Sequence, residues 1–157
     1  MLPETVTKFI GMNYNVALEV EKGAIKRFAE AVGDPNPLYN DEEYAKKSRY
    51  GSVIAPPGYF GWPIKTGSFF LFEIIEPVTN ALANAGYSVA SVIDGGIEYE
   101  FYRPVRAGDT ILASSVVENI TERTGKSGGM VFIIMLTTYL NKSSEVVARQ
   151  RVTFIYR

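Results

Sequence analysis

Val131-Phe132-Ile133-Ile134-Met135-Leu136-Thr137-Thr138-Tyr139-Leu140 is the stretch that decides how the chain folds. Every residue as far as Leu136 is apolar, and the stretch is rich in residues that favour strands. A strand with one solvated face would alternate between apolar and polar residues, whereas a strand covered on both faces need not. We therefore predict a central strand over residues 131–140.

Further strands are predicted on both sides of this stretch. Ile97, Tyr99 and Phe101 alternate with polar residues, which is typical of a half-buried strand over 97–102. Apolar runs predict strands at 111–117 and 146–156, and a first short strand at 15–20. Residues 141–144 form a turn that joins the last two strands as a hairpin, and residues 125–129 form the preceding turn.

Helices are predicted mainly in the first half of the chain. An apolar stripe at helical spacing predicts a helix over 22–32, which Gly33 ends. Charge pairs predict a short helix over 41–47, and another is predicted over 76–85 with Pro77 in its first turn. The segment 69–75 fits helix or strand. Helices before strands indicate the α+β class, with helices on one face of a mostly antiparallel sheet.

Composition excludes several kinds of protein. The chain has 157 residues, which fits one domain over 1–157, and its net charge of −1 argues against nucleic-acid binding. It has no cysteine, no predicted membrane span and no visible signal peptide, so we expect a cytoplasmic protein. It also has no histidine, the commonest general base and metal ligand, and we expect no metal site.

Two motifs indicate a family. Gly33-Asp34-Pro35-Asn36-Pro37-Leu38-Tyr39-Asn40-Asp41 closely resembles the signature G-D-x-N-P-[LIV]-H-x-[DN] of MaoC-like hydratases and dehydratases. Arg103-Pro104-Val105-Arg106-Ala107-Gly108-Asp109 resembles a strand and turn of the same family. Ile54-Ala55-Pro56-Pro57-Gly58 is similar to the N-terminal halves of double dehydratases, the FAS1-like dehydratase type. The resemblance implies a single hot-dog fold, in which a curved antiparallel sheet wraps around a central helix.

The family resemblance also implies a chemistry, namely hydration of trans-2-enoyl thioesters or dehydration of 3-hydroxyacyl thioesters. The acyl group is carried on coenzyme A or acyl carrier protein, and no other cofactor is implied. In the family an Asp and a His activate the water. Asp34 and Asn36 occupy motif positions here, but Tyr39 stands where the His belongs, and tyrosine is a poor base near neutral pH. A glycine amide at the start of the central helix binds the thioester carbonyl; the matching position is Pro57 or Gly58, and Tyr59 follows in the same substrate-binding stretch.

Each of these residues also has a purely structural interpretation. Asp34 and Asn36 suit hydrogen bonds within a proline-rich turn, Tyr39 suits packing, and Asp109 suits a turn after Gly108. Arg103 and Arg106 fit either a solvated surface or the phosphates of coenzyme A. The aromatic stretch 58–62, with Phe69, Phe70 and Phe72, fits an acyl pocket, a core or a dimer interface.

Three functions agree with these observations. The favoured one is a hot-dog subunit that is degenerate at its own Asp/His positions and pairs with a separate catalytic MaoC-like chain. The second is a self-sufficient enzyme, either a hydratase or a hot-dog acyl-CoA thioesterase. The third is a homodimer that binds acyl thioesters without catalysis. Pairing is expected in each case, because a curved open sheet leaves an edge strand for a partner to cover.

Overall fold

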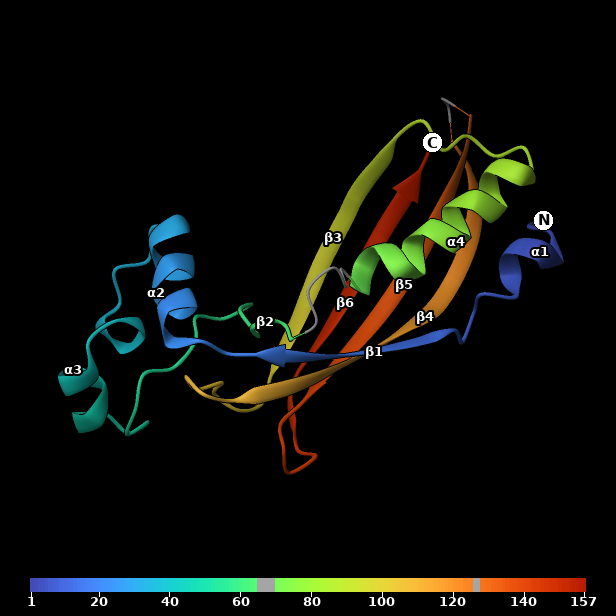
Figure 1. Cartoon of the computed structure of the whole chain (residues 1–157). Helices are drawn as coiled ribbons and strands as arrows, with labels where there is room; N and C mark the ends of the chain where they lie inside the picture. Colours follow the sequence, from blue (N-terminus) through green and yellow to red (C-terminus); the bar gives the residue numbers. More distant parts are fainter. Residues whose placement is uncertain (65–69, 126–127) are drawn as a thin grey trace.

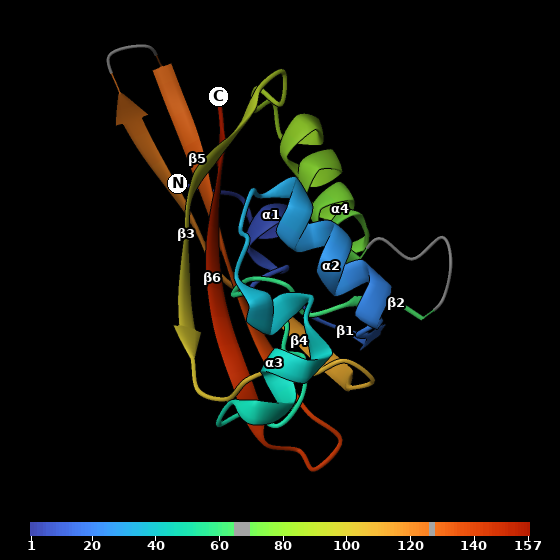
Figure 2. The ribbon, with the colours of Figure 1, turned by 90° about the vertical axis from the view of Figure 1, so that its left-hand side faces the viewer.

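A single antiparallel sheet organises the chain, whose computed structural model describes residues 1–64, 70–125 and 128–157 (Figure 1). Figure 2 shows the helices gathered on one side of the sheet. The strands are β1 (Asn13–Glu19), β2 (Trp62–Pro63), β3 (Val92–Phe101), β4 (Thr110–Gly125), β5 (Gly128–Leu140) and β6 (Val146–Tyr156), in the spatial order β2-β1-β4-β5-β6-β3. The helices are α1 (Glu4–Thr7), α2 (Lys22–Ala31), α3 (Glu42–Lys47) and α4 (Phe70–Asn84), with a 3₁₀ turn at Pro37–Tyr39. Within the described residues, none of the helices has the length and apolarity that crossing a membrane requires.

The strand predictions are confirmed, with longer strands than the sequence indicates. β5 lies between β4 and β6, as predicted for the central strand, and β6 has the predicted bounds. β4 continues eight residues past the predicted end at Val117, because the pairing with β5 passes through a bulge between Val117 and Asn119. β3 begins at Val92 rather than Ile97, and a bulge between Asp94 and Gly96 hides this start from the alternation pattern.

The prediction that β5 is covered on both faces is wrong for this chain. Its residues alternate between buried and partly exposed from Val131 to Leu140. Val131, Ile133 and Met135 point to the side where α4 lies and belong to one buried cluster with Val78 and Leu82 of that helix. The opposite face carries the partly exposed Phe132, Ile134 and Leu136. The apolar run therefore reflects the central position of the strand and not burial of both faces.

Helix α4 begins at Phe70, six residues earlier than predicted, so the ambiguous segment is helical from Phe70 onward. Pro77 consequently lies inside the helix and not in its first turn. A side-chain hydrogen bond between Thr79 and Tyr156 of β6 links the helix to the sheet. The Thr79 hydroxyl donates to the Ile75 carbonyl oxygen at 2.8 Å and lies 2.6 Å from the Tyr156 hydroxyl, which must therefore donate to Thr79.

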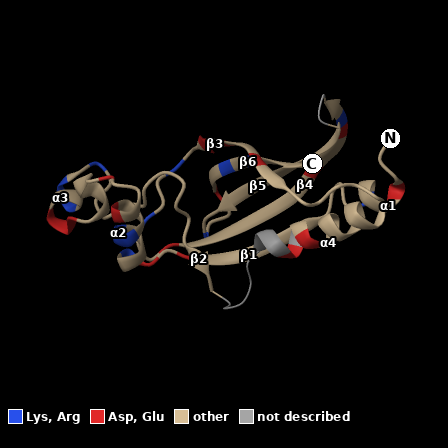
Figure 3. Ribbon diagram, turned by 90° about the horizontal axis from the view of Figure 1, so that it is seen from above, with Lys and Arg blue, Asp and Glu red and all other residues tan. Residues whose placement is uncertain are grey.

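The two N-terminal helices agree closely with the sequence. α2 ends one residue before the predicted end, and Gly33 follows it with a φ of 70°. α3 begins after Asp41, whose carboxylate accepts a hydrogen bond from the Tyr44 amide at 3.0 Å. The N-cap explains why this short helix begins where it does. Positive and negative residues are interspersed on α2 and α3, so these helices present no surface of a single charge (Figure 3).

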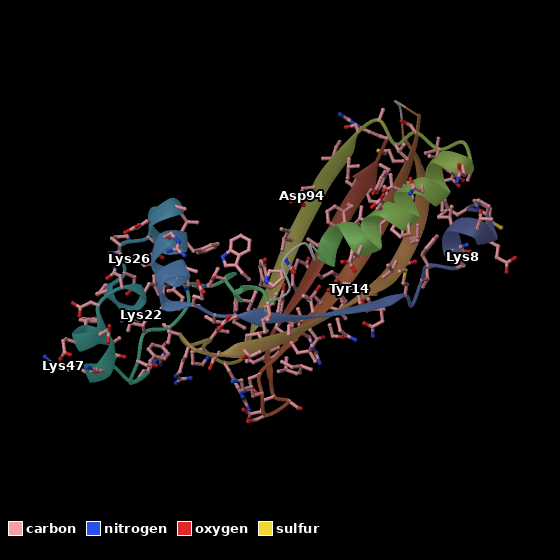
Figure 4. All side chains as sticks on the ribbon, viewed as in Figure 1. Lys8, Tyr14, Lys22, Lys26, Lys47 and Asp94 are labelled. Atoms are coloured by element: carbon pink, nitrogen blue, oxygen red, sulfur yellow. The ribbon has the colours of Figure 1, made fainter. Side chains whose placement is uncertain are left out.

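The inner face of the sheet, defined as the face toward α4, carries two separate buried clusters. One joins α4 to β5 and β6 and includes Val78, Leu82 and Ile133. The other joins α2 and the segment 53–60 to β1 and β4, and includes Ile25 and Ile111. Between them a polar row crosses the strands, formed by residues that are paired in register: Tyr14 of β1 (labelled in Figure 4), Ser115 of β4, Thr137 of β5, Gln150 of β6 and Tyr99 of β3.

Gly61 allows the segment that leads to β2 to lie directly against β1. Its φ is 104°, and a Cβ atom at this position would lie 2.5 Å from the backbone oxygen of Glu19. Gly108 has a similar φ of 88°, but a Cβ atom there would meet no other atom within 4 Å. The two glycines therefore separate the cost of a left-handed backbone from the cost of a steric clash.

We expect Gly61→Ala to lower the free energy of unfolding by about 2–4 kcal/mol, because the left-handed conformation and the backbone clash both contribute. Gly108→Ala, the matched control, should cost only about 1 kcal/mol. Urea unfolding followed by circular dichroism measures both changes. Equal losses of stability in the two variants would show that Gly61 is not closely packed against β1.

Candidate functional site

The signature loop and the stretch 54–60 enclose one cavity, which we call the loop cavity. Its volume is about 570 Å³, within the range of small-molecule sites. Five of the six predicted site residues line it, namely Asn36, Tyr39, Pro57, Gly58 and Tyr59. Asp34 is not part of the lining. The fold therefore brings the two predicted groups of site residues together, although their roles stay predictions.

Asp34 and Asn36 make the hydrogen bonds of a turn. The Asn36 amide donates to the Asp34 carboxylate at 3.1 Å, and the Leu38 amide donates to the Asn36 side-chain oxygen at 3.1 Å. The second bond caps the 3₁₀ turn that carries Tyr39. These contacts fit the structural interpretation of both residues, since one oxygen of each side chain is used to hold the loop.

Tyr39 is buried where the family motif places a histidine. It is 7% exposed and packs in the cluster that includes Ile25 and Ile111. Burial raises the pKa of the Tyr39 phenol, and the nearby charge of Asp34 raises it further, while a side-chain interaction with Asn36 opposes both effects. The phenol is therefore protonated near neutral pH. It can donate a hydrogen bond, but it cannot take a proton from water as a histidine would.

The expectation that Pro57 or Gly58 begins the central helix is wrong. Both lie in a turn, in which the Tyr59 amide donates to the Pro56 carbonyl oxygen at 3.1 Å. The central helix α4 begins only at Phe70. The helix start at Pro57 or Gly58 is implied only by the family resemblance, and residues 56–61 form no helix in this chain. Among the aromatic residues considered for an acyl pocket, Phe69 lies outside the described residues.

Arg49 and Arg103 line the loop cavity, whereas Arg106 does not, and the contacts of the three side chains differ. Arg103 forms an ion pair with Glu145 at 2.8 Å, which fits the solvated interpretation. Arg49 donates to the Tyr50 hydroxyl at 2.6 Å and stacks over its ring. Arg106 donates to the Tyr50 carbonyl oxygen at 3.3 Å. Asp109 accepts from the Arg106 amide at 2.8 Å, as its predicted turn role requires.

A second cavity, which we call the sheet cavity, lies against the inner face of β3, β5 and β6. Its volume is about 430 Å³, and its walls are mainly apolar. The two cavities share Gly58, Tyr59 and Phe60, so this short segment separates them. Within the described residues the buried Tyr59 hydroxyl has no hydrogen-bond partner, although its ring packs on Phe28 at 5.1 Å. An unpaired hydroxyl in this wall fits its predicted contact with a substrate.

Polar side chains in the sheet cavity form a chain of hydrogen bonds. The Tyr139 hydroxyl donates to the Gln150 side-chain oxygen at 2.8 Å, and the Gln150 side-chain nitrogen donates to the Tyr99 hydroxyl at 2.8 Å. Asp94 of β3, labelled in Figure 4, also lines the cavity, but its carboxylate accepts from the Gly96 amide at 2.9 Å within the bulge. In the described part of the chain, no group of three or more acidic residues is placed to hold a metal ion.

The sequence analysis does not find this chain of polar residues. Tyr99, Tyr139 and Gln150 lie on three different strands, and only the strand register brings them together. Alternation along β3 and β6 identifies the face that each residue occupies, but it does not give the register between strands. Tyr99 in addition has the apolar character expected of a core position, so its hydroxyl gives no local signal.

Comparison with known proteins assigns the chain to a family. The family described as "FAS1-like, dehydratase domain region" matches residues 8–150. A UPF0336 protein of Streptomyces avermitilis is 36% identical over 122 residues, which is 74% of each chain. A protein of Thermomonospora curvata, named a probable enoyl-CoA hydratase alpha subunit, is 35% identical over 134 residues. That match covers 81% of this chain and 41% of the relative.

Solved structures of the same fold include two complexes from Mycobacterium tuberculosis. A chain of the ChsH1-ChsH2 complex has a TM-score of 0.79 at 20% identity, covering 92% of this chain and 84% of the other. A chain of the HadBC 3R-hydroxyacyl-ACP dehydratase complex has a TM-score of 0.67 at 20% identity, covering 96% and 98%. A MaoC-like dehydratase from Rhodospirillum rubrum has a TM-score of 0.60 at 26% identity, covering 94% and 91%. The predicted hot-dog fold is thus confirmed, and the chain belongs to the FAS1-like, MaoC-like dehydratase family.

Proposed function

We propose that this chain is the non-catalytic subunit of an acyl-thioester hydratase or dehydratase, and that a second hot-dog chain supplies the catalytic Asp and His. The substrate class is a trans-2-enoyl or 3-hydroxyacyl thioester of coenzyme A or acyl carrier protein. The observation that carries the proposal is the buried, protonated Tyr39 at the position of the catalytic base. The chain contains no histidine to replace it. Adding or removing water involves no change of oxidation state overall, so the reaction needs no redox cofactor.

The carboxylate that remains in the motif does not substitute for the missing base. Asp34 bonds to the Asn36 amide and does not line the loop cavity. A general base has to reach the water that it activates, directly or through one further water. With Tyr39 protonated and Asp34 holding the turn, the loop cavity binds and shapes the thioester in this proposal, and proton transfer takes place on the partner.

The comparisons support a paired assembly. The relative from Thermomonospora curvata is named as an alpha subunit, and two similar structures are complexes of two differently named chains. The strand order offers two possible edges for pairing, β2 and β3. β2 has only two residues, one of them Pro63, which cannot donate a backbone hydrogen bond. β3 has ten residues and pairs on one side only, with β6.

The side chains of β3 also favour this edge as the interface. Ile97, Tyr99 and Phe101 belong to its inner face but are exposed in the chain by itself. On its outer face, Glu98 and Glu100 lie opposite Arg151 and Arg149 of β6. The charged face is thus suited to water, whereas the apolar face gains stability when a second chain covers it. We propose that the catalytic chain joins along β3.

The assembly can be tested by purifying this chain by itself and together with any MaoC-like protein that is encoded beside it. We expect the chain by itself not to hydrate crotonyl-CoA, because it has no base, and the co-purified pair to be active. Hydration is followed by loss of the enoyl absorbance. Robust turnover by the single chain, abolished by Asp34→Ala, would contradict the proposal. Hydrolysis of an acyl-CoA by the single chain would instead identify a thioesterase.

The β3 interface can be tested with one added charge. Ile97→Lys should weaken binding of the catalytic chain by about tenfold or more, because the ammonium group would be buried or would hold the strands apart. Leu112→Lys is the matched control, since Leu112 of β4 is 42% exposed and Ile97 is 46% exposed. Calorimetric titration of each variant with the catalytic chain gives the dissociation constants. Equal effects of both variants would rule out β3 as the pairing edge.

A further inference from the structure

The polar row ends at Tyr99, whose hydroxyl group can donate one further hydrogen bond into the sheet cavity. Ser115 and Thr137 share one hydrogen bond of 2.7 Å between their hydroxyls, in which either one can be the donor. Gln150 lies opposite both Thr137 and Tyr99 in the strand register. The row therefore ends at Tyr99 on β3, the strand with a free edge.

The direction of the hydrogen bonds assigns the spare proton to Tyr99. Tyr139 donates to the oxygen of Gln150, and the nitrogen of Gln150 donates to the oxygen of Tyr99. Each hydroxyl has a single proton, and the Tyr99 oxygen already acts as an acceptor, so its own proton is available to another group. Burial raises the pKa of both phenols, which keeps them protonated near neutral pH. Consecutive hydrogen bonds of this kind polarise the groups that they join, so each bond strengthens the next.

The surroundings of Tyr99 are apolar. Its ring packs 6.1 Å from that of Phe60 and 5.4 Å from that of Phe101. Ile97, Met135 and Val152 line the same cavity. Tyr99 is 37% exposed in the single chain, so water reaches it there. A second chain along β3, together with an acyl group in the cavity, would displace that water and leave the donor unpaired unless the ligand accepts the bond.

We propose that the sheet cavity selects acyl groups that carry an oxygen atom part of the way along the chain, and that Tyr99 donates a hydrogen bond to it. The oxygen belongs to a ketone or hydroxyl group, remote from the carbons that react. The cost of an unpaired buried donor makes a polar site discriminate against a ligand that lacks the matching group. Tyr99 is thus a specificity-determining residue. This inference rests on the proposed function, because the acyl group enters as a thioester.

The Tyr59 hydroxyl is not the donor in this proposal. It lies near α2, where its ring packs on Phe28. Burial raises the pKa of the Tyr59 phenol, Glu21 raises it further and Arg27 opposes both effects. Tyr99 lies at the β3 end, beside the edge at which we place the partner. The two hydroxyls are therefore separate groups, and the experiment addresses Tyr99 through Gln150, its own hydrogen-bond partner.

The test compares dodecanoyl-CoA with a series of its ketone isomers, in which the ketone moves along the chain beyond the fifth carbon. Calorimetry gives the affinity of the co-purified pair of hot-dog chains for each thioester, because the second chain is what excludes water from Tyr99 in this proposal. We expect at least one isomer to bind about tenfold more tightly than dodecanoyl-CoA. Tyr99→Phe should abolish that difference without weakening the binding of dodecanoyl-CoA. Tyr44→Phe, an exposed tyrosine on α3, is the matched control and should retain the difference.

Gln150→Glu provides a second variant of nearly the same shape. The introduced carboxylate accepts hydrogen bonds from both phenols. The Tyr99 hydroxyl then donates to this carboxylate, and only its oxygen remains, as an acceptor, for the ligand. We expect the ketone preference to disappear while the preference for the corresponding alcohol, which can donate, remains. Equal affinities of the unmodified pair for all thioesters, or a ketone preference that survives in Tyr99→Phe, would overturn the inference alone. Failure to bind dodecanoyl-CoA at all would overturn the proposed thioester function and this inference with it.

Discussion

The inner face of the sheet is longer than any one helix of the chain can cover. β4 has 16 residues and spans roughly 50 Å, whereas α4 has 15 residues and spans only about 22 Å. The chain therefore covers this face with two separate elements: α4 packs at one end, and the segment from α2 to Phe60 packs at the other. Figure 1 shows α2 and α4 at opposite ends of β1. Each cover has its own buried cluster.

The region between the two covers accounts for the position of the site. The polar row crosses the sheet there, and the sheet cavity opens beside it. Phe60 belongs to the wall between the two cavities, and its ring stacks on Tyr139 at 3.8 Å. A continuous apolar core would close this space. Its absence between the covers leaves room for a ligand without any loss of strand pairing.

Much of the fold was accessible from the sequence because its local signals agree. The apolar run at 131–136 identified the central strand, and the proline-rich motif at 33–41 identified the loop beside the cavity. Two features depend on distant contacts and were missed. Pro77 is tolerated inside α4, a helix that Val78, Leu82 and the bond from Tyr156 to Thr79 hold against the sheet. The Tyr139–Gln150–Tyr99 chain depends on register across three strands, which no local pattern encodes.

The unequal edges of the sheet limit assembly by strand addition. Joining through β3 uses the one long edge that each such chain has, and β2, with its two residues and Pro63, offers no second edge for a further chain. With the proposed pairing along β3, growth by strand addition would stop at a pair and would not continue into a filament. A protein with an exposed apolar edge strand is thereby protected against open-ended aggregation by the shortness of the strand at its other edge.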